Sequence, residues 1–426
     1  DISPALVAVG FIVNLNVAVL IFIGGSLGWL IGIPILGNGL DFASNPIDGA
    51  WEIWSSKIRY VGVGAMVIGG ISSIFKVRKG LVDAIQVLKD NNSSTSNLKI
   101  KKERNISPKS INILSFLAIF LVMGVYYNIT QSAAITVLTT FIMVIMAFFF
   151  TAVASYIVGL VGNSNSPVSG MTITAVLFTG GLLYVFGFSG KEGMIATLGV
   201  AAIVCCAACT SGDVCNDLKT GQIVGASPFR QQIMQIIGVG VASLVMAPIM
   251  QLLHENTPGG IGGRELSAPQ AGLFASLAKG FFGDGELPWN MVCVGALLGI
   301  VILIIDSIIE RKGISFRLHL MPVAVGIYLP FGLSTPILLG GLMAYLIEKQ
   351  NKININSDDS MQNGILVSSG LIAGESLMGI VLAFIAGFGI NSFSLGLDEG
   401  VKDSITIIVV LVFLFWFFKS SKPKIM

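Results

Sequence analysis

Charge is scarce in this sequence of 426 residues. Only 11% of the residues are Asp, Glu, Lys or Arg, against about 25% in soluble domains. Hydrophobic residues make up 54%, and the mean hydropathy is +0.85. The 51 glycines suit helices that pack closely in lipid. These proportions exclude a soluble globular domain and predict a membrane protein with several spans.

Histidine and cysteine are also few. Two histidines do not suffice for a histidine-built metal centre, and the cysteines cluster mainly on one apolar stretch, which argues against a secreted disulfide framework. The net charge of +2 gives no footprint for nucleic acid. We therefore predict no metal site, no cofactor and no nucleic-acid partner. The chain begins at Asp1 without a basic region typical of a signal peptide, so we expect that an N-terminal portion is missing.

Nine apolar stretches approach or exceed the roughly 20 residues that cross a hydrocarbon core: 58–75, 111–128, 133–161, 168–188, 193–211, 232–253, 289–308, 364–388 and 403–418. Two further stretches, 4–36 and 318–348, are too long for one span and short for two. Both are interrupted near the middle, at Asn14-Leu15-Asn16 and at Pro330-Phe331-Gly332. The sequence thus predicts an all-α polytopic membrane protein with about nine full spans and two broken helical hairpins.

The distribution of Lys and Arg orients these spans, because cytoplasmic loops carry an excess of positive charge. Segment 76–109 is strongly basic, and alternation from there places 19 of the 25 Lys and Arg residues on the cytoplasmic side. We predict a multi-pass protein of the inner cell membrane with a cytoplasmic C-terminus. The predicted organisation is a first hairpin repeat and span (1–90), a cytoplasmic linker (91–109), a central transmembrane bundle (110–310), and a second hairpin repeat with C-terminal spans (311–426).

The two broken stretches resemble each other, which predicts an internal repeat; the alternative is the chance similarity of apolar stretches. VAVGFIVNLNVAVLIFIGGSLGWLI (7–31) aligns without gaps to VAVGIYLPFGLSTPILLGGLMAYLI (323–347), at an offset of 316. The predicted topology enters the two copies from opposite sides, so they form an inverted repeat. In transporters with inverted repeats, the substrate site lies where broken helices meet at the midplane.

Two polar stretches interrupt apolar sequence. TSGDVCNDLKTG (210–221) is either a cytoplasmic loop at a helix end or a non-helical segment that lines a water-filled cavity, since lipid does not tolerate unpaired backbone groups. GNSNSPVSGMT (162–172) is either a short turn or a discontinuous helix. If both line a path, the candidate substrate-binding residues are Asn163, Ser164, Asn165, Ser166, Ser169, Thr172, Thr210, Ser211, Asn216 and Lys219.

Three carboxylates are candidates for proton coupling. Glu375 lies about 11 residues into a predicted span, roughly 16 Å deep, and a carboxylate inside a membrane marks a functional site by default. A structural hydrogen bond or a different span boundary is the alternative. Asp213 and Asp217 in the polar stretch 210–221 could bind protons or a substrate amine. An enzyme is not expected, because the topology separates Cys215 from both histidines.

Taken together, these segments resemble the oligopeptide transporter (OPT) family, most closely its prokaryotic branch. The resemblance is carried by SGDVCNDLKTG with QIVGASPFRQQ, then NSNSPVSGMT, LPWNMV, MPVAVGIYLP and SSGLIAGESLMG, and by SPALVAVGFIV near the N-terminus. Their order and spacing match along most of the chain. Asn14-Leu15-Asn16 departs from the Gly-Pro break of many relatives, and Asn216 replaces a common Gln, which leaves substrate selectivity open.

The resemblance implies a secondary active transporter, typically a proton-coupled symporter of small peptides. One branch of the family moves metal chelates of amino-acid-derived ligands, which is the alternative substrate class. A passive channel is a further alternative, although the sequence lacks repeated short filters. The implied partners are a small peptide or metal-chelate substrate, protons and the lipid bilayer, and a homo-oligomer stays open.

Overall fold

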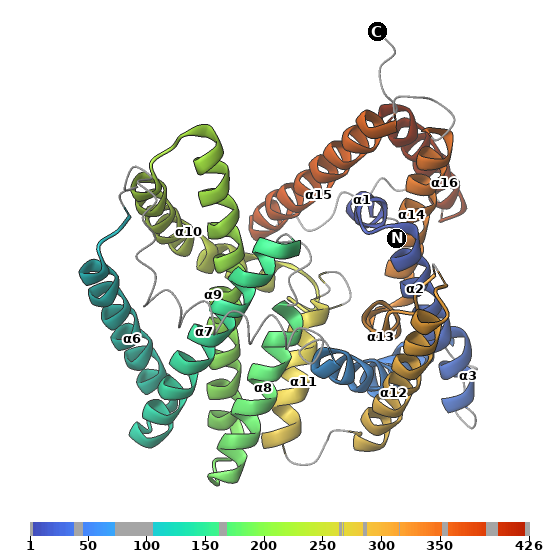
Figure 1. Cartoon of the computed structure of the whole chain (residues 1–426). Helices are drawn as coiled ribbons and strands as arrows, with labels where there is room; N and C mark the ends of the chain where they lie inside the picture. The colour runs from blue at the N-terminus through green and yellow to red at the C-terminus, as the bar shows by residue number, and fades with distance from the viewer. Residues whose placement is uncertain are drawn as a thin grey trace. The chain divides into compact units, whose positions relative to one another are not determined.

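The computed structural model describes residues 3–37, 46–72, 105–161, 168–263, 266, 268–283, 288–314, 316–351, 357–388 and 399–421. Helices dominate this part of the chain, and it contains no β-strand (Figure 1). The elements are α1 Pro4–Ile12, α2 Leu15–Ser26, η1 Leu27–Gly32, α3 Ile33–Leu36, α4 Pro46–Ile53, η2 Trp54–Ile58, α6 Pro108–Thr130, α7 Ala133–Val161, α8 Val168–Val185, α9 Gly190–Val224, α10 Pro228–Asn256, α11 Pro269–Phe282, α12 Trp289–Arg311, α13 Leu320–Tyr328, α14 Phe331–Asn351, α15 Ser357–Gly387 and α16 Glu399–Ser420.

Within the described residues, nine helices are long and apolar enough to cross a membrane. Seven of them coincide with predicted spans. The other two, Leu15–Leu36 and Phe331–Gln350, are the long arms of the two broken stretches. Of the predicted span 58–75, only residues up to 72 are described, and the apolar part of α16, Ser404–Ser420, is shorter than a full span. The prediction of an all-α polytopic membrane protein is confirmed.

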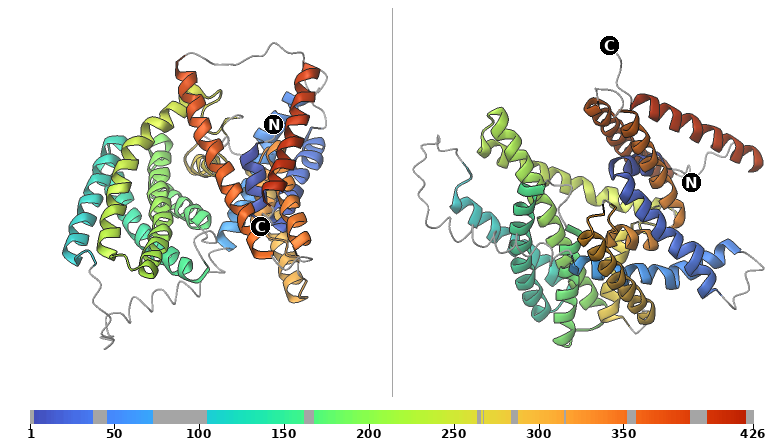
Figure 2. Two further views of the ribbon diagram at one scale, coloured as in Figure 1. Left: turned by 90° about the horizontal axis from the view of Figure 1, so that it is seen from above. Right: turned by 45° about the vertical axis from the view of Figure 1, so that its right-hand side comes forward.

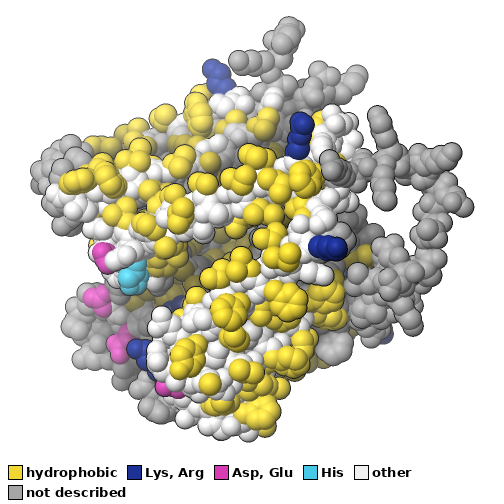
Figure 3. Space-filling model, turned by 90° about the vertical axis from the view of Figure 1, so that its left-hand side faces the viewer, with side chains coloured by type: hydrophobic (Ala, Val, Ile, Leu, Met, Phe, Trp, Pro, Cys, Tyr) yellow, Lys and Arg dark blue, Asp and Glu magenta, His cyan; other side chains and the backbone are white. Residues whose placement is uncertain are grey.

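The chain forms two compact units. The first comprises Asp1–Ile68, Ile249–Pro269 and Pro288–Met426, and the second comprises Gly69–Pro248 and Gln270–Leu287. In the second unit, α7 and α8 pack on α9 around a buried cluster that includes Phe150, Met171 and Val204. Many large hydrophobic side chains of α6 and α10 are exposed, and one hydrophobic surface is visible in Figure 3. Such a surface suits contact with lipid rather than water.

The first unit contains both copies of the repeat, and each is broken where predicted. α1 ends at Ile12 and α2 begins at Leu15, whereas α13 ends at Tyr328 and α14 begins at Phe331. The two breaks therefore fall at equivalent positions of the alignment. Asn14 at the first break has a φ of 76°, a left-handed value that is uncommon for any residue except glycine.

The copies pack on each other through reciprocal glycine contacts. An added Cβ at Gly10 would lie 2.0 Å from the carbonyl oxygen of Ile337, and one at Gly326 would lie 2.1 Å from that of Ile21. The repeat offset of 316 relates the two pairs: Gly10 corresponds to Gly326, and Ile21 corresponds to Ile337. Figures 1 and 2 show the helices involved, α1 and α2 in blue and α13 and α14 in orange.

A second glycine pair obeys the same rule. Gly24 faces the carbonyl oxygen of Val323 at 2.1 Å, and Gly340 faces that of Val7 at 1.9 Å, both measured from an added Cβ. Short arm α1 thus packs on α14, and short arm α13 packs on α2, while the two arms of one copy scarcely contact each other. The arms therefore do not form a self-contained hairpin within each copy. Instead, the glycines allow the arms of one copy to pack closely on those of the other.

The two long arms run antiparallel. Gly25 of α2 meets Phe331 and Ser334 near the start of α14, and Gly341 meets Leu15 and Ala18 near the start of α2. A two-fold relation between antiparallel helices has its axis across the helices, so it lies in the membrane plane when they span. That is the geometry of an inverted repeat.

Candidate functional site

Glu375 binds the N-terminus of the short helix α1. It lies near the middle of the candidate span Met361–Gly387 of α15. The hydroxyl of Ser3 donates to its Oε1 over 2.6 Å, and the backbone N–H of Ala5 donates to its Oε2 over 2.7 Å. Two of the segments that carry the family resemblance, SPALVAVGFIV and SSGLIAGESLMG, therefore meet at this carboxylate.

The carboxylate completes the hydrogen bonding of the first turn of α1. The first helical residue is a proline, which has no N–H. The N–H of Ala5 is bound by Glu375, that of Leu6 donates to the Ser3 Oγ over 3.1 Å, and that of Val7 donates to the Ser3 carbonyl oxygen over 3.2 Å. A helix N-terminus favours negative charge. Ionised Glu375 therefore stabilises the start of α1.

Core packing fixes α1 against α15 and α14. The ring of Phe11 contacts Gly364 so closely that an added Cβ would approach it to 2.4 Å. Phe11 also meets the buried Phe417 of α16 edge-on, with ring centroids 5.2 Å apart. The position of α1, and with it the partner of Glu375, is thus set by apolar contacts on several sides.

The polar stretch 210–221 is helical throughout, so both the loop and the non-helical segment expected from the sequence are wrong. It forms the later part of α9, which continues to Val224 and ends at Gly225, with a left-handed φ of 77°. The stretch contains no proline, and its hydroxyls bond back within the helix. Ser211 Oγ donates to the Ala208 carbonyl oxygen over 2.7 Å, and Thr220 Oγ1 donates to that of Asn216 over 2.9 Å.

The charged side chains of this stretch contact amides. The Asp217 carboxylate accepts a hydrogen bond from Gln235 of α10 over 3.0 Å. Lys219 donates to Gln222 one turn further along α9, also over 3.0 Å. Of the candidate residues, Ser211 is buried, whereas Thr210, Asp213, Asn216, Asp217 and Lys219 are exposed. Their roles in substrate binding and proton coupling stay predictions.

The second polar stretch is described only in its later part. Asn163, Ser164, Asn165 and Ser166 lie outside the described residues. Ser169 and Thr172 belong to the first turns of α8, and Thr172 is buried, with its Oγ1 donating to the Val168 carbonyl oxygen over 3.0 Å. This bond is internal to the helix, so a role of Thr172 in substrate binding stays a prediction.

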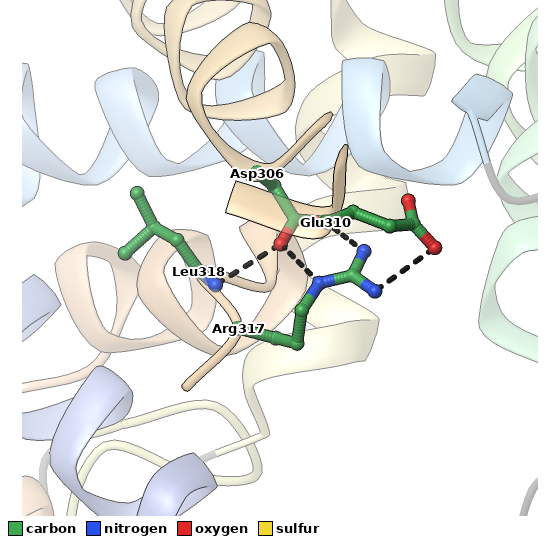
Figure 4. A network of polar contacts seen from close by, with 4 residues as sticks. All are labelled: Asp306, Glu310, Arg317 and Leu318. Atoms are coloured by element: carbon green, nitrogen blue, oxygen red, sulfur yellow. Dashed lines mark hydrogen bonds and ion pairs between the residues drawn. The ribbon is translucent and has the colours of Figure 1, made fainter. Parts of the chain in front are cut away.

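Buried Asp306 of α12 forms an ion pair with Arg317, which lies in the turn that precedes α13 (Figure 4). Its carboxylate accepts two hydrogen bonds of 2.9 Å from the guanidinium of Arg317 and one of 3.0 Å from the N–H of Leu318. Glu310 accepts a further contact from Arg317 at 3.0 Å. The hydrogen bonds that Arg317 donates to Asp306, and next to those the one to Glu310, raise the pKa of Arg317 above its ordinary value. The group fixes the turn that leads into the second copy.

Comparison with protein families decides the assignment. The family model described as "OPT oligopeptide transporter protein" matches residues 1–386. The chain belongs to this family. Its members are membrane transporters and not enzymes, as expected from the sequence. Both family segments at the Glu375 contact lie within the matched residues.

Several relatives resemble this OPT chain along most of its length. A Haemophilus influenzae protein named "Putative oligopeptide transporter" is 33% identical over 418 residues, which covers 90% of this chain and 65% of the relative. A "Probable metal-nicotianamine transporter" of rice is 23% identical and covers 88% of this chain and 54% of the relative. One of Arabidopsis thaliana is also 23% identical, with coverages of 92% and 58%. The chain thus spans roughly half to two thirds of these relatives.

A further group of this OPT chain was not predicted as a site. A cavity of about 400 Å³ in the first unit is lined by Trp51, Trp54, Arg59 and Tyr328, with Asp48 and Glu52 also on its wall. Three of the five tryptophans of the chain, at positions 29, 51 and 54, gather beside it. The clustering of three tryptophans within 26 positions was the sequence feature that could have indicated this site.

Proposed function

We propose that the protein is a proton-coupled symporter that carries oligopeptides or peptide-like solutes into the cell. The observation that carries the proposal is the Glu375 carboxylate, held near the middle of a candidate span by the N-terminus of a broken helix. An ionisable side chain inside a membrane commonly marks an ion pathway or proton relay. The membership in the OPT family supports the transporter class.

The contact suggests how protonation would drive a conformational change. Ionised Glu375 accepts from Ser3 and Ala5 and interacts favourably with the helix dipole of α1. Protonation removes the charge, so the attraction to the helix dipole is lost and the N–H of Ala5 donates to a neutral oxygen, which makes a weaker hydrogen bond. The start of α1 is then bound less tightly. Proton binding would thereby favour a state in which α1 moves relative to α15.

Metal chelates are the second candidate substrate class. The specific support is the similarity to the plant proteins named as metal-nicotianamine transporters. Nicotianamine-type ligands share amino and carboxylate groups with peptides, so one site chemistry would serve both. Within the described residues, no cluster of three or more His, Cys, Asp or Glu side chains could hold a metal ion. A metal would therefore enter as part of its chelate.

The orientation belongs to the same proposal. The positive-inside distribution supports an inner-membrane location with a cytoplasmic C-terminus. The exposed polar face of α9 at Asp213 and Asn216 would then line the cytoplasmic end of the transport path. Lys219 would lie at its mouth.

Transport by Glu375→Gln in proteoliposomes tests the proposal. Glutamine keeps an acceptor oxygen for the N–H of Ala5 but does not titrate at physiological pH. We expect uptake driven by a pH gradient to fall by at least about tenfold, the effect of losing roughly 1.4 kcal/mol of coupling, while exchange without net proton movement persists. The matched control is Glu192→Gln, at an exposed carboxylate in the first turn of α9.

Two outcomes would count against the proposal. Unchanged coupling to the pH gradient in folded Glu375→Gln would remove this carboxylate from the mechanism. Solute flux through the wild-type protein that ignores the gradient and exceeds any carrier turnover would favour the passive channel. Labelled di- to hexapeptides compared with metal chelates would separate the two substrate classes.

A further inference from the structure

The cavity beside Arg59 is lined by one unusual helical turn, and a second one packs next to it through Trp29. η1, which contains Trp29, and η2, which begins at Trp54, are both π-helical. Such turns are rare and occur frequently at functional sites. Tyr328 and Pro330 on the wall belong to the break of the second repeat copy. The wall of the cavity thus combines one irregular turn, η2, with a discontinuous helix, the element at which transporters place their substrates.

Aromatic rings hold the walls in place. The rings of Trp29, Trp51 and Trp54 contact one another pairwise, with centroids 5.3 to 5.9 Å apart. The guanidinium of Arg59 lies 4.8 Å from the ring centroid of Tyr328 and 5.8 Å from that of Trp54, and it donates to the Tyr328 hydroxyl. These contacts orient the positive charge without neutralising it.

Buried donors without acceptors lie on the wall of this cavity, at Arg59 and Trp54, and beside it, at Trp29. No carboxylate among the described residues lies within ion-pair distance of Arg59. The Nε of Arg59 and the indole N–H groups of Trp29 and Trp54 are buried and have no hydrogen-bond partner in the described part of the chain. An unsatisfied buried donor is costly, and such groups in a native structure call for a partner. All three atoms are donors, so the missing partner is an acceptor. The positive charge of Arg59 favours an anionic group next to it, whereas Asp48 and Glu52 on the same wall favour a cationic group, a combination that suits a zwitterion.

We propose that this cavity binds the carboxylate of an amino-acid-derived solute, with Arg59 and the indole N–H of Trp54 as its donors. Arginine presents N–H groups in a fork that matches a carboxylate. The exposed carboxylate of Glu52 on the same wall would face the solute's ammonium group. A volume of about 400 Å³ lies within the roughly 300–1,000 Å³ of small-molecule sites. This inference rests on the proposed transport of peptide-like solutes and assigns them a binding site.

Equilibrium binding to the intact purified transporter tests the assignment. The probes are trialanine, its C-terminal amide, a ferrous nicotianamine complex and inorganic phosphate, and the intrinsic tryptophan fluorescence reports occupancy of the site. For the wild type we expect amidation to weaken binding of trialanine about tenfold or more, because the charge-assisted hydrogen bonds are lost. In Arg59→Gln, free acid and amide should bind equally weakly.

Matched variants separate binding from folding. Lys57→Gln removes a neighbouring basic residue that does not line the cavity, and it should keep the preference for the free acid. Trp54→Phe keeps an aromatic ring but loses the indole N–H, so it should weaken binding of the acid more than that of the amide. Gel filtration and thermal unfolding show whether Arg59→Gln folds. If it does not, Trp54→Phe is used to test the inference.

The outcomes distinguish this inference from the proposed function. Tight binding of the nicotianamine complex alone, lost in Arg59→Gln, would keep the carboxylate site and assign it to chelates. A preference for the free acid that survives in Arg59→Gln and Trp54→Phe would overturn the inference, as would equal competition by inorganic phosphate. Wild-type protein that transports with a proton gradient but binds acid and amide equally would also overturn it, yet leave the symporter standing. Absence of any gradient-driven uptake would instead refute the proposed function.

Discussion

Alanine substitutions at the four reciprocal glycines should destabilise the protein strongly and in symmetric pairs. In the contact between α1 and α14, the Cβ of Gly10→Ala would lie 2.0 Å from a carbonyl oxygen, and that of Gly340→Ala would lie 1.9 Å from one. A carbon and a carbonyl oxygen approach each other to about 3.3 Å in packed helices. The helix backbones must therefore separate locally by roughly 1.3 Å (3.3 − 2.0), since backbone atoms cannot rotate away.

Overpacking of this kind costs about 1–3 kcal/mol and occasionally more, so we expect each variant to lose at least about 2 kcal/mol. The control Gly332→Ala lies in α14 with nothing within 4 Å of an added Cβ, and it should be neutral or gain up to about 1 kcal/mol from helix propensity. Unfolding of the purified protein by heat or by sodium dodecyl sulfate, followed by tryptophan fluorescence, measures these differences.

Double variants make this prediction sharper. Gly10→Ala and Gly340→Ala both force α1 and α14 apart, so the double variant should lose less free energy of unfolding than the sum of the two single losses. Gly10→Ala acts on the contact between α1 and α14, and Gly24→Ala acts on that between α2 and α13. Their losses of unfolding free energy should be nearly additive. If Gly10→Ala and Gly340→Ala cost no more than Gly332→Ala, the reciprocal packing of the copies would be refuted.

Two further substitutions test local features of the first unit. Asn14→Gly should raise stability by up to about 1 kcal/mol, because glycine adopts the left-handed φ of 76° without strain; a decrease in the thermal midpoint would show that the Asn14 side chain matters more than its backbone. Asp306→Ala should cost about 1–3 kcal/mol, since it leaves the N–H of Leu318 without its carboxylate. Glu310→Ala, at an exposed carboxylate of the same group, should cost less in the same unfolding assay.

The repeat could be predicted from the sequence because it rests on matched residues at a fixed offset. Glycines that permit close approach are conspicuous in an apolar stretch, and the partner oxygens at Ile21 and Ile337 follow the same offset. Glu375 was predictable as well, since a lone carboxylate in a long apolar run is costly unless it has a partner. Its partner at Ser3, 372 residues away, was not predictable from local pattern.

The remaining features required the three-dimensional structure. Polarity at 210–221 suggested a loop, but hydroxyls such as those of Ser211 and Thr220 can bond back to the helix, so composition did not decide the backbone conformation. The pair of Asp306 and Arg317 depends on the turn after α12, whose direction the sequence leaves open. The Arg59 cavity draws on segments that only the fold brings together.

The contact between Ser3 and Glu375 also has a consequence for biosynthesis. At synthesis rates of about 5–20 residues per second, the 372 residues between them require roughly 20–75 seconds to emerge. During that interval the N–H of Ala5 has no carboxylate to bind, and α14, on which α1 packs, does not yet exist. With nine residues, α1 is too short to cross the bilayer alone. Its final position is therefore acquired late, after α15 has been made.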